Sequence, residues 1–264
     1  MNIHVSYPSR LYSDKLSLDC GSTRICHDIS VAIPDRGFTV IIGPNGCGKS
    51  TLLRGLSRLV RPSAGKVHLD GKVISDYSTR EVAQRLGLLP QSAQAPEGIR
   101  VGELVSRGRF PYRRAFSTWS DEDERAVLAA LQATSTLELI DREVDTLSGG
   151  QRQRVWIALA LAQETPVLLL DEPTTFLDIA HQIELLNLLR NLKETGNRTL
   201  VAVLHDLNHA CRYADHLIAM RDGRILFEGS PAEIITPSNI EALFGLRCVV
   251  ISDPVSGTPL VVPR

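Results

Sequence analysis

The sequence predicts an α/β fold, in which short buried strands alternate with helices. Residues 38–42 (FTVII) form a β-branched run that ends at a glycine, which is typical of a strand. Residues 167–170 are entirely apolar, as expected for a strand buried on both faces of a parallel sheet. Other segments carry apolar residues at helical spacing. Together these three observations indicate a sheet covered by helices.

The N-terminal part is expected to contain strands after an irregular start. Residues 1–15 are polar and irregular, so we expect them to be loose. From Leu16 short apolar runs alternate with turn signals, which indicates strands. The apolar spacing of residues 52–60 predicts a helix that Pro62 ends. Residues 66–69, followed by Asp-Gly, predict a strand and a tight turn.

The middle of the chain, about residues 92–163, is expected to form a helical subdomain. Ser120 precedes four acidic residues, a capping pattern that predicts a helix immediately after it. A second helix is expected from Leu147 to about Gln163. We expect residues 16–264 to form a single domain that includes this subdomain.

The second half alternates between strands and helices. The expected elements are a strand at 167–170, a helix at 179–194, a strand at 199–204, a helix at 206–213 and a strand at 217–220. Near the C-terminus, two apolar runs flank a segment rich in Pro and Gly, which predicts a β-hairpin over about residues 248–263.

Composition and charge disfavour several classes of protein. The 264 residues carry 29 Lys and Arg against 30 Asp and Glu, and the net charge of −1 gives no support to nucleic-acid binding. No apolar run approaches the roughly 18 residues that cross a bilayer, and the N-terminus lacks the apolar core of a secretory signal. Five cysteines without a CxxC spacing indicate reduced thiols in a cytosolic compartment.

Residues 43–51 match the phosphate-binding pattern G-x-x-x-x-G-K-[ST], between an expected strand and an expected helix. Glycines let backbone N–H groups surround phosphate oxygens at a helix N-terminus. Lys49 is expected to reach the β- and γ-phosphates, and Ser50 to place its hydroxyl on Mg²⁺. A glycine-rich turn that matches by chance is the alternative, which this context disfavours. The nucleotide-binding residues expected here are Gly43, Pro44, Asn45, Gly46, Cys47, Gly48, Lys49, Ser50 and Thr51.

Cys47 lies inside this loop, and the simplest interpretation is that its backbone alone contacts the ligand. Because a helix N-terminus lowers the pKa of a cysteine, the thiol is also a candidate for reaction. We hypothesise that alkylation of Cys47 inhibits the protein and that ATP protects it.

The strand over residues 167–170 is followed by two carboxylates, Asp171 and Glu172. In enzymes with such a phosphate loop, a carboxylate at this place holds Mg²⁺, and we expect Asp171 to do so. Glu172 points differently along the strand and is suited to orient the attacking water as general base. Two solvated loop acids are the alternative, which the preceding buried strand disfavours. A kinase, a GTPase, a helicase and a transporter motor all remain open at this point.

Residues 147–151 (LSGGQ) precede an expected helix, with Ser148 as a natural N-cap and two glycines that leave the backbone open to a ligand. Together with the phosphate loop, this segment resembles the ATP-binding subunits of ABC transporters and matches their signature without a mismatch. The resemblance implies an ABC ATPase cassette: a P-loop NTPase (RecA-like) core, an antiparallel β subdomain and a helical signature subdomain. It also implies ATP and Mg²⁺ as cofactors, and ATP hydrolysis coupled to transport.

The same resemblance implies further site residues. Gln91 matches the glutamine that contacts Mg²⁺ and the attacking water, Asp178 matches the D-loop aspartate, and His205 matches the histidine that contacts the γ-phosphate. With Lys49 and Glu172, Gln91 and His205 complete the implied catalytic set. The family works as a head-to-tail homodimer, in which one subunit binds the ATP of the other through its signature, here Ser148, Gly149, Gly150 and Gln151.

One position departs from the family. An aromatic residue usually stacks on adenine, and this chain has Cys20 there. Since a thiol offers little stacking surface, we expect Cys20→Tyr to tighten ATP binding and the natural chain to tolerate GTP well.

The resemblance extends from about Leu16 to Arg264 and is closest to the importer ATPases of the iron–siderophore, haem and cobalamin group. It is carried by residues 42–54, 101–112, 171–182, 205–215 and 245–263, and the tail resembles ferric-enterobactin-type subunits. The implied function is to power import of a ferric siderophore through two membrane permease subunits, supplied by an extracytoplasmic substrate-binding protein. The expected location is peripheral, on the cytoplasmic face of the inner membrane. Haem or cobalamin import, or a soluble ABC ATPase such as an iron–sulfur assembly factor, are the alternatives.

Residues 92–115 are expected to face the permease, because in this family a short helix of the membrane subunit enters the groove behind the glutamine loop. Arg107, Arg109, Arg113 and Arg114 give this stretch a positive charge. We hypothesise that charge reversal at Arg109 uncouples transport and leaves basal ATPase intact.

Overall fold

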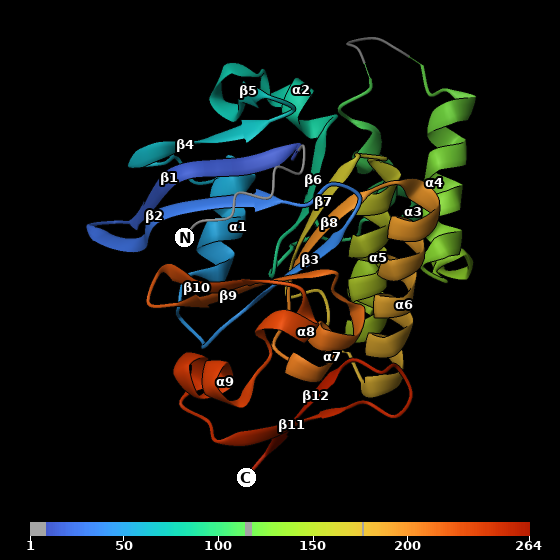
Figure 1. Ribbon diagram of the computed structural model, residues 1–264. Coiled ribbons are helices and arrows are strands. Elements are labelled where there is room, and N and C mark those ends of the chain that lie inside the picture. Colours follow the sequence, from blue (N-terminus) through green and yellow to red (C-terminus); the bar gives the residue numbers. More distant parts are fainter. Residues whose placement is uncertain (1–8, 114–117, 176) are drawn as a thin grey trace. The chain divides into compact units, whose positions relative to one another are not determined.

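The computed structural model describes residues 9–113, 118–175 and 177–264. Its contacts divide the chain into two compact units, which can be followed by colour in Figure 1. The first unit comprises Met1–Asp76 and Thr199–Arg264, and the second comprises Tyr77–Arg198.

The second unit extends beyond the helical subdomain expected at about residues 92–163, and the expected single domain over 16–264 stays a prediction. The second unit is larger because it contains strands as well as helices. These strands, β6 (Leu86–Leu89) and β7 (Val167–Asp171), pair in parallel.

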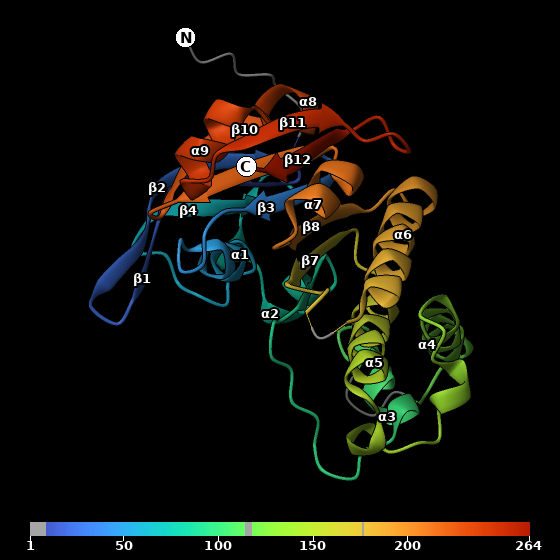
Figure 2. The same ribbon diagram turned by 90° about the horizontal axis from the view of Figure 1, so that it is seen from below.

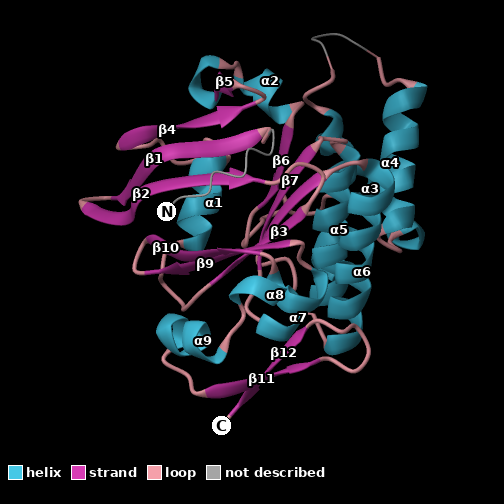
Figure 3. Ribbon diagram, in the orientation of Figure 1, coloured by secondary structure: helices cyan, strands magenta, loops and turns pink. Residues whose placement is uncertain are grey.

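The described residues of the first unit contain an antiparallel sheet, four strands of a second sheet and a two-stranded C-terminal hairpin, with the strands drawn in magenta in Figure 3. β3 (Phe38–Ile42) runs parallel to both β8 (Thr199–Val203) and β9 (His216–Arg221), whereas β10 (Arg224–Gly229) is antiparallel to β9. The antiparallel sheet has the order β2 (Thr23–Ile33), β1 (Leu11–Cys20), β4 (Ala64–Leu69) and β5 (Lys72–Val73). The strands of the second sheet that belong to this unit are, in spatial order, β10 (Arg224–Gly229), β9 (His216–Arg221), β3 (Phe38–Ile42) and β8 (Thr199–Val203).

The prediction that residues 1–15 are loose is wrong for its last part, because β1 already begins at Leu11. Polar residues hid the strand: Ser13 is buried, and its hydroxyl donates a hydrogen bond to the Ile29 carbonyl oxygen at 2.9 Å. A buried hydroxyl that finds such a partner costs little, so a polar strand can pack in a core. Residues 1–8 lie outside the described part of the chain.

The helix after the phosphate loop is shorter than the apolar spacing of residues 52–60 predicts. α1 (Lys49–Leu56) ends one turn early, since Arg58 has a left-handed backbone (φ 65°) and the Leu59 and Val60 amides both donate to the Arg54 carbonyl oxygen. This is a hydrogen-bonded helix C-terminus, and it leaves Leu59 exposed.

Besides α1, the described part of the first unit contains three α-helices that precede the C-terminal hairpin. They are α7 (Leu207–Tyr213), α8 (Pro231–Ile234) and α9 (Pro237–Phe244). The C-terminal hairpin is present, with β11 (Cys248–Ser252) antiparallel to β12 (Pro259–Pro263).

In the second unit, three helices pack against one another in the middle of the chain. Ser120 and Ser148 both form capping boxes at the starts of α4 and α5, as their sequence patterns predict. The helices are α2 (Thr79–Ala83), α3 (Val101–Ser106), α4 (Asp121–Ala133), α5 (Gly149–Ala162) and α6 (Ile179–Gly196), and α3, α4 and α5 form the packed group. Within the described residues, no helix is both long enough and apolar enough to span a bilayer.

Candidate functional site

The phosphate loop turns between β3 and α1 on glycines that no other residue could replace without strain. Gly46 and Gly48 have φ of 78° and 102°, in the region that favours glycine. A Cβ on Gly43 would lie 2.1 Å from the Met220 carbonyl oxygen. The loop backbone is therefore held close to β9, with its helix N-terminus available for an anion.

Lys49 is the first residue of α1 and is almost fully buried. Its Nζ donates hydrogen bonds to the carbonyl oxygens of Gly43 at 2.9 Å and Pro44 at 2.8 Å. Within the described residues no carboxylate pairs with this ammonium. The loop therefore contains a buried positive charge that is solvated by carbonyl dipoles alone.

Cys47 does not have the reactive environment that was hypothesised. Its side chain is buried, and this burial raises the pKa of the Cys47 thiol by more than the charge of Lys49 lowers it. The neighbouring Cys26 is also buried, and burial raises the pKa of its thiol to about 12. Both thiols are protonated at neutral pH and act as small packing groups.

Gly223, in the turn between β9 and β10, holds the phosphate loop in place through its backbone and was not predicted from the sequence. The Gly223 amide donates to the Cys47 carbonyl oxygen at 3.1 Å, and the Gly223 carbonyl accepts from the His27 amide at 2.9 Å. A Cβ on Gly223 would lie 2.1 Å from the Ile25 carbonyl oxygen. The Asp-Gly pair between β9 and β10 is a standard hairpin signal that could have located it.

His205 also belongs to the first unit and follows β8, as predicted. Its side chain is exposed. The backbone on both sides of His205 is held by hydrogen bonds. The Leu204 amide donates to the Ile41 carbonyl oxygen at 3.4 Å, and Asp206 caps α7. A histidine at the carboxyl end of a strand in an α/β fold lies where ligands commonly bind.

In the second unit, the strand β7 ends at Asp171, whose side chain is 1% exposed. Glu172 follows with φ of 54°, a left-handed backbone that is uncommon for a residue other than glycine. Gln91 Nε2 donates to Glu172 Oε2 at 2.7 Å, and Thr175 Oγ1 donates to the same oxygen at 3.4 Å. The structure thus brings the predicted residues Gln91 and Glu172 together and adds Thr175.

The LSGGQ segment forms the N-terminus of α5. The Gln151 amide donates to Ser148 Oγ at 3.3 Å, and the Ser148 amide donates to Gln151 Oε1 at 3.1 Å. The capping box thus fixes the backbone of Gly149 and Gly150 while both glycines present no side chain. This end of α5 can accept an anionic group.

Asp178 caps α6, because its Oδ1 accepts a hydrogen bond from the His181 amide at 2.9 Å. The His181 ring nitrogen Nδ1 lies 2.8 Å from the same oxygen. These hydrogen bonds, the backbone one first, lower the pKa of the Asp178 carboxyl. Ile179 beside it is 77% exposed.

Arg109 does not face outward, so the expectation that it adds positive charge to a surface facing the permease is wrong. It is 2% exposed, with Nε 2.9 Å from Asp123 Oδ1 and Nη1 2.7 Å from Glu164 Oε2. Nη1 also donates to the Ala162 carbonyl oxygen at 2.9 Å, and the guanidinium lies 4.2 Å from the ring centre of Tyr112. Arg109 is therefore a structural residue that ties together α4 and the end of α5.

The other arginines of this stretch differ in position. Arg107 and Arg113 are exposed, and Arg113 lies 5.8 Å from the ring centre of Trp119. Phe110, next to the buried Arg109, is 57% exposed. Arg114 lies outside the described residues. Exposed arginine and aromatic side chains therefore remain among the described residues of this stretch, at Arg107, Phe110, Arg113 and Trp119.

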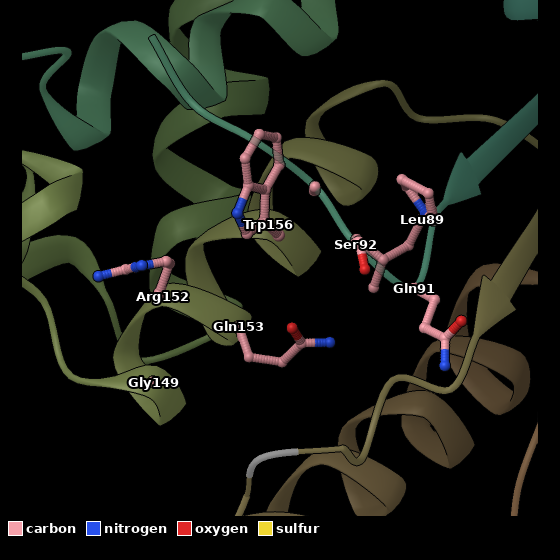
Figure 4. A pocket seen from close by; sticks show the side chains of 9 residues that line it. Leu89, Gln91, Ser92, Gly149, Arg152, Gln153 and Trp156 are labelled. Atoms are coloured by element: carbon pink, nitrogen blue, oxygen red, sulfur yellow. The ribbon is translucent and has the colours of Figure 1, made fainter. Parts of the chain in front are cut away.

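A pocket of about 320 Å³ opens within the second unit (Figure 4). One wall is the segment that leaves β6 and includes Gln91, and the other is the first two turns of α5. Trp156 and Arg152 project from α5 beside this pocket in Figure 4. The lining residues are Leu89, Pro90, Gln91, Ser92, Ala93, Gly149, Arg152, Gln153 and Trp156.

The predicted site residues thus fall into two groups, one in each compact unit. The first unit contains Gly43, Pro44, Asn45, Gly46, Cys47, Gly48, Lys49, Ser50, Thr51 and His205. The second unit contains Gln91, Ser148, Gly149, Gly150, Gln151, Asp171, Glu172 and Asp178.

Comparison with known proteins shows which proteins this chain is similar to. The family model described as "ABC transporter" matches residues 26–175. The ferric enterobactin transport ATP-binding protein FepC of Escherichia coli (strain K12) is 58% identical over 255 residues, which cover 97% of this chain and 94% of that protein. An inward-facing metal-chelate type ABC transporter aligns with a TM-score of 0.82 at 30% identity, over 97% of both chains. The dimeric bacterial ABC transporter cassette MJ0796 aligns with a TM-score of 0.75 at 29% identity, over 83% of this chain and 98% of that one.

Proposed function

The chain belongs to the ABC transporter family as an ATP-binding protein, and from this premise we propose that it hydrolyses ATP to power import of a ferric siderophore through a membrane permease. The predicted ABC ATPase cassette fold is confirmed. The observation that carries the cargo class is the match to a ferric enterobactin transport ATP-binding protein, which covers nearly the whole of both chains.

The phosphate loop supports binding of the ATP phosphates. Lys49 is already directed into the loop and is held by two carbonyl oxygens, so an anion there gains a strong electrostatic partner. The left-handed glycines and the N-terminus of α1 supply backbone N–H donors. Phosphoryl transfer depends mainly on such positioning and charge stabilisation.

Glu172 is the proposed general base. Its Oε2 accepts hydrogen bonds from Gln91 and Thr175, so the carboxylate is held in one orientation. It takes the proton of the water that attacks the γ-phosphate, while the Gln91 amide orients that water. His205 donates a hydrogen bond to a γ-phosphate oxygen and completes the proposed set.

The donor chemistry of three residues fits Mg²⁺. Ser50, Gln91 and Asp171 offer a hydroxyl, an amide and a carboxylate oxygen, which are the hard ligands that this ion prefers. When bound, the ion neutralises charge on the β- and γ-phosphates. The almost complete burial of Asp171 favours a role for its carboxylate beyond surface solvation.

We place the signature of a second copy over each ATP. The capped start of α5 presents Ser148 and two glycines, which suit close approach to a phosphate. Asp178 and Ile179 are exposed at the start of α6 and are assigned to the same homodimer contact. A relative of known structure is a dimeric cassette. In such an arrangement hydrolysis occurs only in the closed dimer, which couples chemistry to motion.

The permease contact is assigned to residues 92–113 and the pocket beside Gln91. The pocket shares a wall with the glutamine that orients the water, so an inserted segment can influence hydrolysis directly. Exposed Phe110 and Arg113 extend this surface. The chain would act with two permease subunits and a substrate-binding protein, at the cytoplasmic face of the membrane.

The test is uptake of radioactive iron by cells that lack this protein, supplied with several ferric siderophores, with haem and with cobalamin. The cells are complemented with the natural chain, with Glu172→Gln, or with Glu184→Gln as a control. Glu184 is exposed on α6 and outside the proposed site.

Loss of uptake of one ferric siderophore, restored by the natural chain and by Glu184→Gln but not by Glu172→Gln, supports the proposal. Loss of haem or cobalamin uptake instead would reject the siderophore as the cargo but would still support a role in import. Unchanged uptake of all of them would point to a soluble partner, such as an iron–sulfur assembly scaffold.

A further inference from the structure

The side chain of Asn208 attaches the C-terminal hairpin to α7. Asn208 is the second residue of α7, and its Oδ1 accepts a hydrogen bond from the Val261 amide at 2.8 Å. Its Nδ2 donates to the Val261 carbonyl oxygen at 3.4 Å. A single amide thus pairs with both backbone groups of one residue of β12, as a neighbouring strand would.

The surrounding contacts extend this attachment. β12 lies beside α7 in both Figure 1 and Figure 2, and Val261 is buried. In the turn of the hairpin, backbone amides of Ser256 and Val255 lower the pKa of the Asp253 carboxyl, and the positive charge of Arg212 on α7 contributes. The hairpin therefore contacts α7 through β12, and the charge of Arg212 adds an electrostatic attraction to the hairpin turn.

The helix held in this way begins directly after His205. The imidazole is exposed, and the backbone on either side of it is held by hydrogen bonds. On one side the Leu204 amide is bonded to Ile41 of β3, and on the other Asp206 Oδ1 accepts from the His209 amide at 2.7 Å. A rotation of α7 would move His205, whereas β8 would stay in its sheet.

We infer that Asn208 is a positioning residue for His205: by tying α7 to the C-terminal hairpin, it holds the imidazole where it can contact the γ-phosphate. This inference rests on the proposed function of His205. Since a displacement of about 1 Å in a catalytic group can cost up to roughly a hundredfold in rate, loss of the Asn208 amide should lower turnover by about tenfold. Binding of nucleotide through the phosphate loop should change little.

The test compares Asn208→Ala, Asn208→Asp and Asn239→Ala in the purified protein. Asn208→Asp keeps the acceptor for Val261 and loses the donor. Asn239 is the matched control, because its Nδ2 also donates to a backbone carbonyl, that of Ile234 at 2.8 Å, on α9. The measurements are kcat and KM for ATP, the Kd for ADP, which lacks a γ-phosphate, and the Tm.

We expect Asn208→Ala to lower kcat about tenfold with KM for ATP and Kd for ADP within about twofold, and Asn208→Asp to lie between it and the natural chain. Asn239→Ala should keep the natural kcat. A natural kcat in Asn208→Ala, or an equal loss in Asn239→Ala, would overturn the inference. A natural chain without ATPase activity, or an active Glu172→Gln, would overturn the proposed function as well.

Discussion

Lys49 and Arg109 are both buried cations to which the sequence analysis gave a role toward another molecule, yet their surroundings differ. Arg109 is paired with Asp123 and Glu164 and donates to a carbonyl at the end of α5. Lys49 is surrounded by loop carbonyls, and no carboxylate of the described residues pairs with it. A buried cation that is paired with carboxylates of its own chain stabilises the fold. A buried cation that is hydrogen-bonded to neutral carbonyl groups can still bind an anionic ligand.

The largest expected effect tests the structural half of this comparison. Arg109→Met removes the guanidinium and leaves Asp123 and Glu164 without their partner, so we expect the free energy of unfolding to fall by about 3–5 kcal/mol. Urea unfolding followed by circular dichroism measures it. Arg107→Met, at an exposed neighbour, should change stability by less than about 0.5 kcal/mol. A stable Arg109→Met chain that hydrolyses ATP but fails in transport would restore the permease contact.

The second effect tests the functional half. Lys49→Met should keep the fold and lower ATP hydrolysis by about 10²–10³-fold, because a preorganised charge on the phosphates is lost. A phosphate-release assay and a thermal melt measure the two quantities. Lys66→Met, which changes an exposed lysine of β4, is the control and should leave both unchanged. An active Lys49→Met chain would remove the distinction between the two cations.

A third prediction extends the comparison to the base of the nucleotide. Cys20 is exposed at the end of β1, where an aromatic ring would have room. Cys20→Tyr should tighten ATP binding by about tenfold, since base stacking contributes about 1–3 kcal/mol. Titration calorimetry with ATP and GTP measures it, with Ser22→Tyr in the adjacent turn as control. A natural chain that strongly prefers ATP to GTP would contradict this prediction.

The smallest expected effect concerns the thiol beside Lys49. Because burial raises the pKa of Cys47, its thiolate fraction at pH 8 is lower than that of an ordinary cysteine. Iodoacetamide should therefore modify exposed Cys20 and leave Cys47 largely unmodified, equally with and without ATP. Mass spectrometry of tryptic peptides measures both. Rapid labelling of Cys47 that ATP prevents would show that Lys49 outweighs burial.

The parts of the candidate site that could be predicted are those formed by residues that are adjacent in the sequence. The phosphate loop and the LSGGQ segment each combine glycines, a cap and a helix start within a few positions, so local rules suffice. The buried strand β7 with its two following carboxylates is similarly local. The whole fold class follows from the alternation of such segments.

The parts that could not be predicted depend on partners far away in the chain. Arg109 is separated by 55 positions from Glu164, and no local pattern signals their ion pair. Asn208 and Val261 are 53 positions apart. The buried serine of β1 and the early end of α1 likewise follow from hydrogen bonds that tertiary packing decides.

The left-handed backbone of Glu172 has a consequence for how this chain can be engineered. A glycine there would relieve the backbone strain, which costs of order 1–3 kcal/mol, but it would remove the proposed base. A library screened only for thermostability should therefore enrich glycine at position 172 and accumulate inactive chains. Selection for thermal stability and selection for ATP turnover would favour different amino acids at position 172.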